Sequence, residues 1–160
     1  VVKVTANILE NFELADIIRG SSEDFEVMFN KKDADSVYRA QIDFYCKNFI
    51  YTQGGEPIEF RAKGGIAKQY AVPDTKTVST IGAGDNFNAG FVYGLIKYGV
   101  TRDMLDEGVA EDVWDAVICE ANQFAANVCA SINNSVDQDF AQQKQQELEV
   151  ALKDMEENNQ

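Results

Sequence analysis

The sequence contains no histidine. This absence excludes a Ser-His-Asp or Cys-His catalytic system, zinc sites built on histidine, and a histidine general base. Any acid–base chemistry must therefore use a carboxylate, a lysine or a tyrosine. The three cysteines, Cys46, Cys119 and Cys129, lack the spacing of a metal site. We expect them to be buried thiols in a reducing, cytoplasmic compartment.

Basic residues are also scarce, with 14 Lys and Arg against 27 Asp and Glu and a net charge of −13. Nucleic-acid binding requires a basic face, so we expect no nucleic-acid partner. No apolar run is long enough to cross a bilayer, and we expect no membrane partner. The opening residues, VVKVTANILENFE, lack the basic and apolar segments of a signal peptide. Because the sequence does not begin with Met, we expect it to be part of a longer protein.

What is present indicates a globular α/β chain, since 45% of the 160 residues are apolar. Strand patterns alternate with helical ones, which favours a mainly parallel sheet. The segments IEFRA and IAKQYAV, joined by Lys63-Gly64-Gly65, predict an antiparallel hairpin. Strands are also predicted at 15–18 and 48–53. Helices are predicted at 4–13, after Ser21 and Ser22, at 33–47, from Asp85, from Thr101, at 113–132, and from Gln138.

The most informative stretch is STIGAGDNFNAGF, which places Gly82, Ala83 and Gly84 directly before Asp85 and a helix. A helix start has unpaired N–H groups and partial positive charge, so this turn could hold an anion. The alternative interpretation is a glycine turn with a capping aspartate. The stretch lacks the Gly-Lys-Ser/Thr of a Walker A loop and the third glycine of a dinucleotide fingerprint. A carboxylate beside a phosphate fits a base that deprotonates an attacking alcohol.

The segment TIGAGDNFNAGF resembles the C-terminal signature of the PfkB family of ribokinase-like carbohydrate kinases, commonly Asp-Thr-Thr-Gly-Ala-Gly-Asp-Ser-Phe-x-Ala-Gly. ADIIRGSSEDF is similar to the family's Asn-x-x-Glu region, YTQGG to its Thr-x-Gly-x-x-Gly loop, and ANQFAANVCA to the helix beside adenine. The resemblance implies a three-layer α/β/α ribokinase-like fold. Residues 1–160 correspond to its C-terminal nucleotide-binding and catalytic part, without the N-terminal sugar-binding part and the lid.

The resemblance also implies a role for individual residues in ATP-dependent, Mg²⁺-assisted phosphorylation of a sugar, with fructokinase- or ribokinase-like substrates the best match. Asp85 is the expected base, and the N–H groups of Gly82, Ala83 and Gly84 are the expected anion hole. The expected nucleotide contacts are Thr52, Gly54, Asn122 and Ala126. The expected magnesium-linked acid is Glu23 or Asp24, which have an equally favoured interpretation as helix N-terminal charges.

The sequence departs from the family pattern at several motif positions. Ser79 and Ile81 replace the usual Asp and second Thr, so we expect little activation by a monovalent cation such as potassium. Pro57 stands where the family's nucleotide loop has its second glycine.

A homodimer of the full-length protein is expected through the lid, and the isolated chain is expected to be inactive. The alternatives are a non-catalytic nucleotide-binding or regulatory module and a purely structural α/β domain, neither of which explains Asp85.

Overall fold

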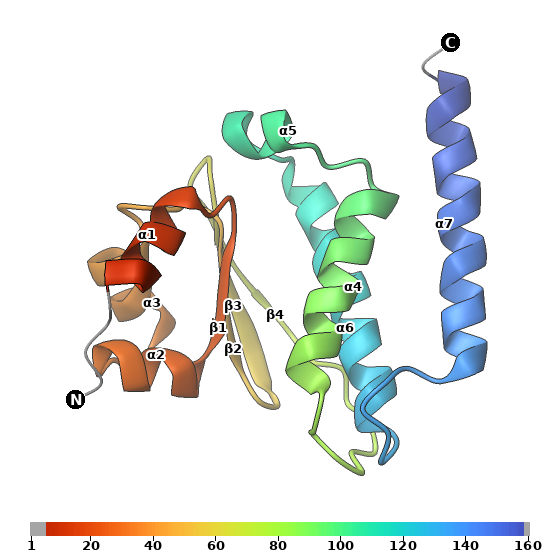
Figure 1. Ribbon diagram of the computed structural model, residues 1–160, viewed down its shortest axis with the longest axis horizontal. Coiled ribbons are helices and arrows are strands. Elements are labelled where there is room, and N and C mark those ends of the chain that lie inside the picture. The colour runs from red at the N-terminus through yellow and green to blue at the C-terminus, as the bar shows by residue number, and fades with distance from the viewer. Residues whose placement is uncertain (1–5, 159–160) are drawn as a thin grey trace. The chain divides into compact units, whose positions relative to one another are not determined.

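The computed structural model describes residues 6–158 (Figure 1). Val4 and Thr5, at the start of the predicted helix 4–13, lie outside the described residues. The chain divides into two compact units. The first unit contains the residues up to Val72 together with Arg102–Gly108, and the second contains Pro73–Thr101 and the residues from Val109 onward. Within the described part of the chain, no helix combines the length and apolarity needed to cross a membrane.

The first unit is built on a mixed sheet of four strands in the order β1-β2-β3-β4. The strands are β1 (Ile18–Ser21), β2 (Phe49–Gln53), β3 (Glu56–Ala62) and β4 (Ile66–Tyr70). The predicted hairpin is confirmed as β3 and β4. Only β1 and β2 pair in parallel, and the other two pairings are antiparallel. Among the described strands the sheet is therefore mixed rather than mainly parallel, because short turns join β2, β3 and β4 in sequence and leave no room for helical crossovers.

Strand β1 lies further along the chain than the predicted strand at 15–18. Its pairing with β2 joins Ile18 to Phe49 and Ser21 to Thr52, so the strand includes the polar end of the segment. Of the predicted residues only Ile18 belongs to β1, because the hydrogen-bonded register with β2 determines where the strand begins and ends.

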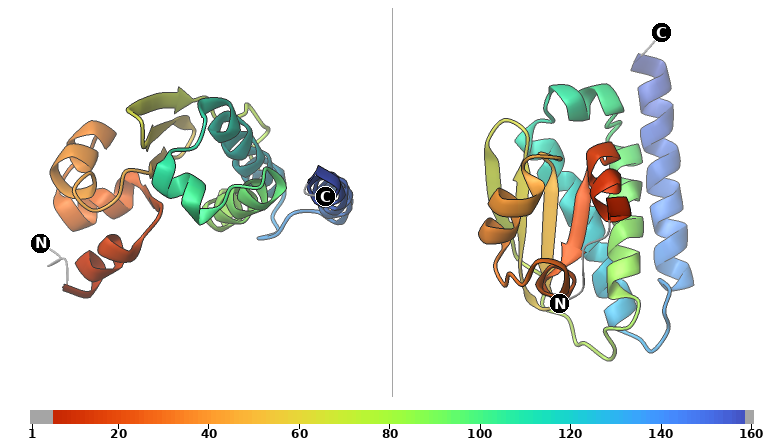
Figure 2. Two further views of the ribbon diagram at one scale, coloured as in Figure 1. Left: turned by 90° about the horizontal axis from the view of Figure 1, so that it is seen from above. Right: turned by 60° about the vertical axis from the view of Figure 1, so that its left-hand side comes forward.

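Helices α1 (Ala6–Leu14), α2 (Ser22–Phe29) and α3 (Ala34–Val37) lie on one side of β1 and β2 (Figures 1 and 2). Aromatic rings join them to the sheet: the Phe25 ring stacks on the Tyr51 ring at 5.8 Å and lies 5.4 Å from the Phe49 ring. The predicted helix 33–47 is instead α3 followed by a π-helix, η1 (Tyr38–Ile42). The N–H of Asp43 bonds to the carbonyl of Tyr38 at 2.8 Å, five residues back, which is the π-helical spacing. Helix α5 (Arg102–Glu107) completes this unit.

The second unit consists of α4 (Ala83–Lys97), α6 (Glu111–Cys129) and α7 (Gln138–Asn158), close to the predicted helices. Two glycines of α4 let it lie against the backbone of α6. A Cβ atom on Gly90 would meet the Glu120 carbonyl oxygen at 2.8 Å, and one on Gly94 would meet Val117 Cα at 3.0 Å. Trp114, the single tryptophan, is buried and stacks on Phe91, with ring centroids 6.3 Å apart. The glycines after the Gly-Ala-Gly turn therefore serve helix packing.

Replacing Gly90 by alanine is expected to destabilise the second unit. The added methyl group collides with a backbone carbonyl that cannot move alone, and overpacking of this kind costs about 1–3 kcal/mol. That cost exceeds the gain of about 1 kcal/mol that alanine brings to a helix interior. Thermal unfolding of Gly90→Ala should be compared with Asn88→Ala, an exposed position on the same helix. Equal melting temperatures would show that α4 and α6 can move apart to admit the methyl group without loss of stability.

A buried charge cluster joins α7 to the other two helices of this unit. Lys144 and Glu120 are 4% and 3% exposed, and Lys144 Nζ lies 2.8 Å from Glu120 Oε2. Lys97 Nζ lies 2.7 Å from both Glu120 Oε1 and Glu147 Oε2. The hydrogen bond from Lys97 lowers the pKa of Glu147 to about 2. Glu120 is thus the shared partner of two cations.

Removing that shared acid should destabilise the second unit strongly. Glu120→Ala leaves Lys97 and Lys144 to share the single carboxylate of Glu147, and breaking a buried pair costs about 3–5 kcal/mol. Chemical unfolding should show this loss for Glu120→Ala but not for Glu149→Ala, since Glu149 is an exposed acid on α7. A matched loss in both variants would assign the effect to net charge rather than to the buried cluster.

Candidate functional site

The Gly-Ala-Gly turn forms the N-terminus of α4, as the sequence predicts. Gly82 is the N-cap and has a φ of 82°, in the left-handed region that glycine favours. A Cβ atom there would lie 3.2 Å from the carbonyl oxygen of Asn134. The Asn86 side chain donates to the carbonyls of Gly82 and Asn134 at 2.9 and 3.0 Å. The turn is therefore held against the 131–137 segment of its own unit.

Asp85 lies in the first turn of α4 and is exposed. Its carboxylate makes no hydrogen bond or ion pair with any part of the chain that the structure describes. Gly84 and Asp85 are first-turn positions, whose N–H groups have no acceptor within the helix. The N–H of Ala83, by contrast, bonds to the carbonyl of Thr80 at 3.2 Å. The turn thus offers an accessible carboxylate beside helix N-terminal donors.

The predicted nucleotide loop lies in the first unit, at the carboxyl ends of the parallel strands β1 and β2. Thr52 ends this pairing opposite Ser21, and Gly54 has a φ of 65° in the turn to β3. The Thr52 hydroxyl accepts a hydrogen bond from Arg19 Nη2 at 2.9 Å and donates to the carbonyl of Gly20 at 3.4 Å. Carboxyl ends of parallel strands are the usual ligand edge of an α/β sheet.

Glu23 and Asp24 both lie in the first turn of α2. Asp24 Oδ2 accepts from the N–H and the hydroxyl of Ser21 at 2.8 and 2.7 Å, and the Ser21 hydroxyl accepts from the N–H of Asp24. The backbone hydrogen bond from Ser21 is the main reason that the pKa of Asp24 is lowered. Asp24 is thus a capping-box residue. Among the described residues, no group of three or more acids and cysteines is placed to hold a metal.

Asn122 and Ala126 lie one turn apart on α6, in the same unit as Asp85. Asn122 is buried at 8% exposure, and Ala126 is half-buried. The remaining predicted contacts, Thr52, Gly54, Glu23 and Asp24, belong to the first unit.

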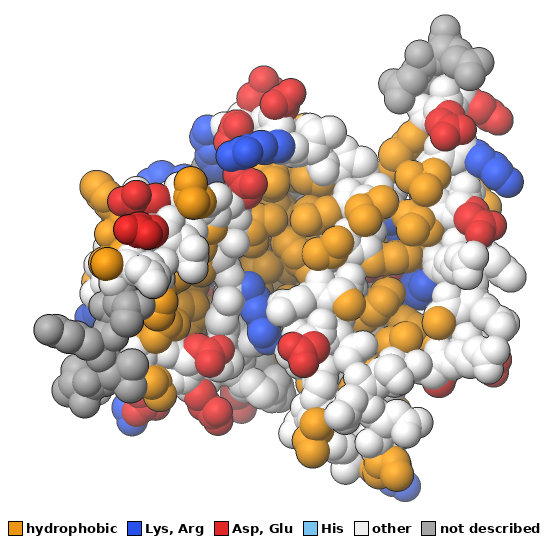
Figure 3. All heavy atoms as spheres, in the orientation of Figure 1, with side chains coloured by type: hydrophobic (Ala, Val, Ile, Leu, Met, Phe, Trp, Pro, Cys, Tyr) orange, Lys and Arg blue, Asp and Glu red, His pale blue; other side chains and the backbone are white. Residues whose placement is uncertain are grey.

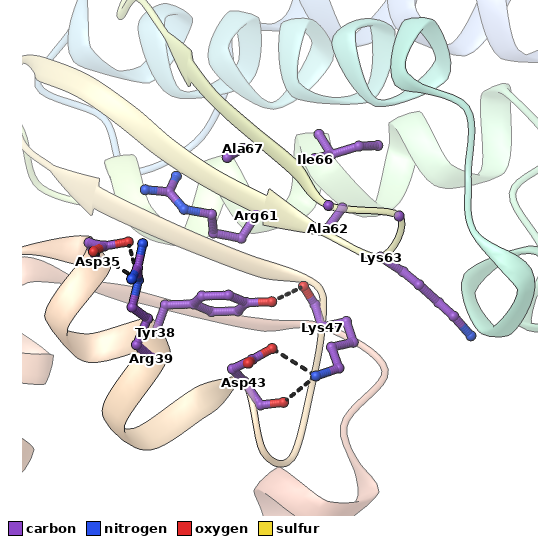
Figure 4. A pocket seen from close by; sticks show the side chains of 12 residues that line it. Asp35, Tyr38, Arg39, Asp43, Lys47, Arg61, Ala62, Lys63, Ile66 and Ala67 are labelled. Atoms are coloured by element: carbon purple, nitrogen blue, oxygen red, sulfur yellow. Dashed lines mark hydrogen bonds and ion pairs between the residues drawn. The ribbon is translucent and has the colours of Figure 1, made fainter.

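A cavity of about 740 Å³ opens in the first unit between η1 and the β3–β4 hairpin (Figure 4). Its lining contains none of the predicted site residues. Three of its basic side chains are paired: Arg39 with Asp35, Lys47 with Asp43, and Arg61 with Glu59, at 3.0, 2.8 and 3.1 Å. Lys63 bonds to the carbonyl of Asp106. This cavity is distinct from the residues of the candidate site.

Comparison with known proteins decides the family. The sequence model of the pfkB family carbohydrate kinases matches residues 3–136. The chain belongs to the pfkB family of carbohydrate kinases. The expectation drawn from the Gly-Ala-Gly-Asp segment is therefore confirmed at the level of the family.

Individual members of the pfkB family resemble the chain over part of their length. It is 30% identical to 5-dehydro-2-deoxygluconokinase 1 of Bacillus cereus over 90 residues, covering 53% of the chain and 27% of the relative. Aminoimidazole riboside kinase from Salmonella enterica, solved with aminoimidazole riboside and an ATP analogue, superposes with a TM-score of 0.66 at 20% identity, covering 88% of the chain and 44% of that structure.

The ribokinase-like fold is confirmed by a second solved structure. Ribokinase from Thermotoga maritima gives a TM-score of 0.57 at 22% identity and covers 91% of the chain and 44% of that structure. The chain therefore spans less than half the length of these pfkB-family proteins.

Sequence reasoning overlooked Arg19, whose guanidinium bonds to Thr52. The sequence offered only a weak signal, a basic residue directly after the predicted strand in a chain with few basic residues. Its partner lies 33 residues away and could not be identified without the register of β1 and β2.

Proposed function

We propose that the chain supplies the catalytic base, the anion hole and the nucleotide site for ATP-dependent phosphoryl transfer to a sugar hydroxyl. The observation that carries this proposal is the position of Asp85, exposed in the first turn of α4 immediately after a turn with positive φ at Gly82. A non-catalytic nucleotide-binding module is the alternative. It gains nothing from a carboxylate beside bound phosphates, whereas a kinase needs a group that accepts the hydroxyl proton.

In this proposal Asp85 takes the proton of the attacking hydroxyl, and the N-terminus of α4 stabilises the charge on the transferred phosphoryl group. The available donors are the first-turn N–H groups, chiefly that of Gly84, since the N–H of Ala83 already bonds to Thr80. Thr52 and Gly54, in the first unit, are the proposed contacts of the ATP phosphates, and Asn122 and Ala126, in the second unit, are the proposed adenine contacts.

Magnesium fits one of the two candidate acids better than the other. Mg²⁺ keeps several waters and is usually held by one or two carboxylates together with substrate phosphates. Glu23 is exposed at the start of α2, whereas Asp24 Oδ2 already accepts two hydrogen bonds from Ser21. We therefore propose Glu23 as the acid linked to Mg²⁺. The ion would neutralise charge on the nucleotide phosphates.

We further propose that residues 1–160 are the C-terminal part of a longer cytoplasmic kinase, in which the remainder contacts the sugar, carries the lid and provides a dimer contact. The curated relatives and solved structures extend well beyond the matched region. We expect that remainder to recognise the sugar, because the candidate residues in this chain serve the nucleotide and the reacting hydroxyl.

The proposal is tested by measuring ATP consumption by the full-length protein across a panel of sugars and sugar derivatives with Mg²⁺. A sugar-dependent rate that yields a phosphorylated product and ADP supports it. ATP binding without turnover on any member of a broad panel would favour the regulatory module instead.

A further inference from the structure

The Arg19 side chain bonds to the residue at which the candidate nucleotide loop begins. Arg19 and Thr52 lie on the same face of the β1–β2 pair, because Arg19 pairs with Ile50 and Ser21 pairs with Thr52. Arg19 Nη2 donates to Thr52 Oγ1 at 2.9 Å, and Thr52 Oγ1 donates onward to the Gly20 carbonyl at 3.4 Å. Two neighbouring residues of β1, Arg19 as donor and Gly20 as acceptor, thus hold the Thr52 hydroxyl.

The hydrogen bond from Arg19 to Thr52 belongs to the class with a charged donor, which is stronger than a bond between neutral groups. A hydrogen bond from a charged guanidinium is about twice as strong as a neutral one, and the planar group loses little freedom on forming it. Arg19 is also half-buried, where solvent competes less than at the surface. By comparison, the Arg39 bond to Asp35 joins side chains that are 77% and 53% exposed, and such a pair contributes little.

The position of Thr52 shows which part of the chain the hydrogen bond from Arg19 holds in place. Thr52 is the last residue of β2 paired with β1, and the pairing of β2 with β3 becomes irregular between Tyr51 and Gln53. From this point the chain enters the two-residue turn at Gly54 and Gly55, which the pairing of Gln53 with Glu56 closes. A side-chain bond at Thr52 is therefore well placed to set where the turn starts.

We propose that Arg19 is a positioning residue for the nucleotide loop, acting through the Thr52 hydroxyl to hold the Gln53-Gly54-Gly55 turn in its ATP-binding conformation. This inference rests on the proposed function, which assigns that turn to ATP. It assigns a role to Arg19, a residue of the ADIIRGSSEDF segment to which the sequence analysis gave none. It also gives Thr52 a defined task, since its hydroxyl is engaged with β1.

The proposal predicts a selective loss of nucleotide affinity in the full-length kinase. Arg19→Gln should raise the KM for ATP and the Kd for ADP on the order of tenfold, as expected for loss of one charge-assisted hydrogen bond. The kcat and the KM for the sugar should change less than about twofold, because the bond contributes to binding in both ground and transition states. Arg19→Lys, which can still donate to the hydroxyl, should recover most of the affinity.

A double-variant cycle tests whether Arg19 acts through Thr52. Thr52→Val keeps the shape of the side chain and removes its hydroxyl, and should weaken ADP binding about as much as Arg19→Gln. The double variant should be no weaker than either single one, because both remove the same bond. Additive losses would overturn the proposal by showing that Arg19 acts independently of Thr52, for example by contacting phosphate itself.

Two further comparisons test whether the loss is specific to Arg19. Arg39→Gln removes an equal charge from the same unit and should leave the Kd for ADP unchanged; an equal loss there would overturn the proposal in favour of general electrostatics. Normal ADP binding by Arg19→Gln would also overturn it. Failure of the proposed function is a different result, namely no sugar-dependent turnover by the wild-type protein, or full turnover by Asp85→Asn.

Discussion

Asp85→Asn should remove turnover of the full-length kinase while leaving nucleotide binding intact. A positioned general base contributes roughly 10²–10⁴-fold to the rate, and asparagine keeps the shape of the side chain while losing its basicity. Asp85 is exposed in the first turn of α4 and bonds to no described residue, so the substitution should not disturb packing. Affinity for ATP should hold or rise, because a negative charge beside the phosphates is gone.

The measurement is kcat for sugar phosphorylation together with the Kd for ADP by calorimetry. Asp139→Asn is a matched control, since Asp139 is an exposed acid in the first turn of α7 and lies beyond the family-matched residues. It should leave both quantities unchanged. Near-normal kcat in Asp85→Asn, with the control also normal, would remove Asp85 from the role of base.

The local part of this site was predictable from sequence, because the relevant interactions are close in the chain. Glycine at position 82 provides the positive φ, and Asp85 follows it within one turn, so the motif alone places a carboxylate at a helix N-terminus. The capping box of Ser21 and Asp24 is local in the same way. Sequence reasoning named Asp24 as a magnesium-linked acid or a helix N-terminal charge, and the hydrogen bonds with Ser21 add a capping role that it had not named.

The parts that sequence did not predict depend on residues that are distant in the chain. The Arg19–Thr52 bond and the Lys144–Glu120 pair span 33 and 24 residues, and neither leaves a periodic pattern. The start of β1 at Ile18 depends on its register with Phe49 rather than on its own apolar run. The π-helical turn at Tyr38 likewise shares its composition with an ordinary helix. The family signature predicts the chemistry of the site but not the contacts that support it.

The chain of residues 1–160 alone should fail to phosphorylate any sugar, even where the full-length kinase is active. Phosphoryl transfer requires both reactants to be held in line and water to be excluded. In the proposed function Asp85 accepts the proton of the reacting hydroxyl and the turn before it holds the phosphoryl group, so neither of them holds the rest of the sugar. The chain covers 44% of the aminoimidazole riboside kinase structure and 27% of the Bacillus relative, so we expect the sugar contacts and the lid in the remainder.

The second unit also exposes several apolar side chains. Ile81, next to the turn, is 66% exposed, and Val92 and Ile96 on α4 are 53% and 48% exposed. Figure 3 shows exposed hydrophobic side chains over α4. Apolar side chains exposed along one helix are typical of surface that another part of the protein covers. Without such cover, the isolated chain should also tend to self-associate.

Three measurements on the isolated chain, followed by a reconstitution experiment, test this prediction. Circular dichroism first establishes that the isolated chain is folded, and calorimetry with ADP and Mg²⁺ should then show weak binding, because the proposed nucleotide contacts lie within these residues. Product formation from ATP and the sugar panel should stay at the level of full-length Asp85→Asn, the inactive reference. Adding the remainder of the kinase as a separate polypeptide should restore turnover if that part supplies the missing sugar contacts. Sugar phosphate made by the chain alone at the full-length rate would contradict the prediction, because these residues would then contain the sugar site as well as the base.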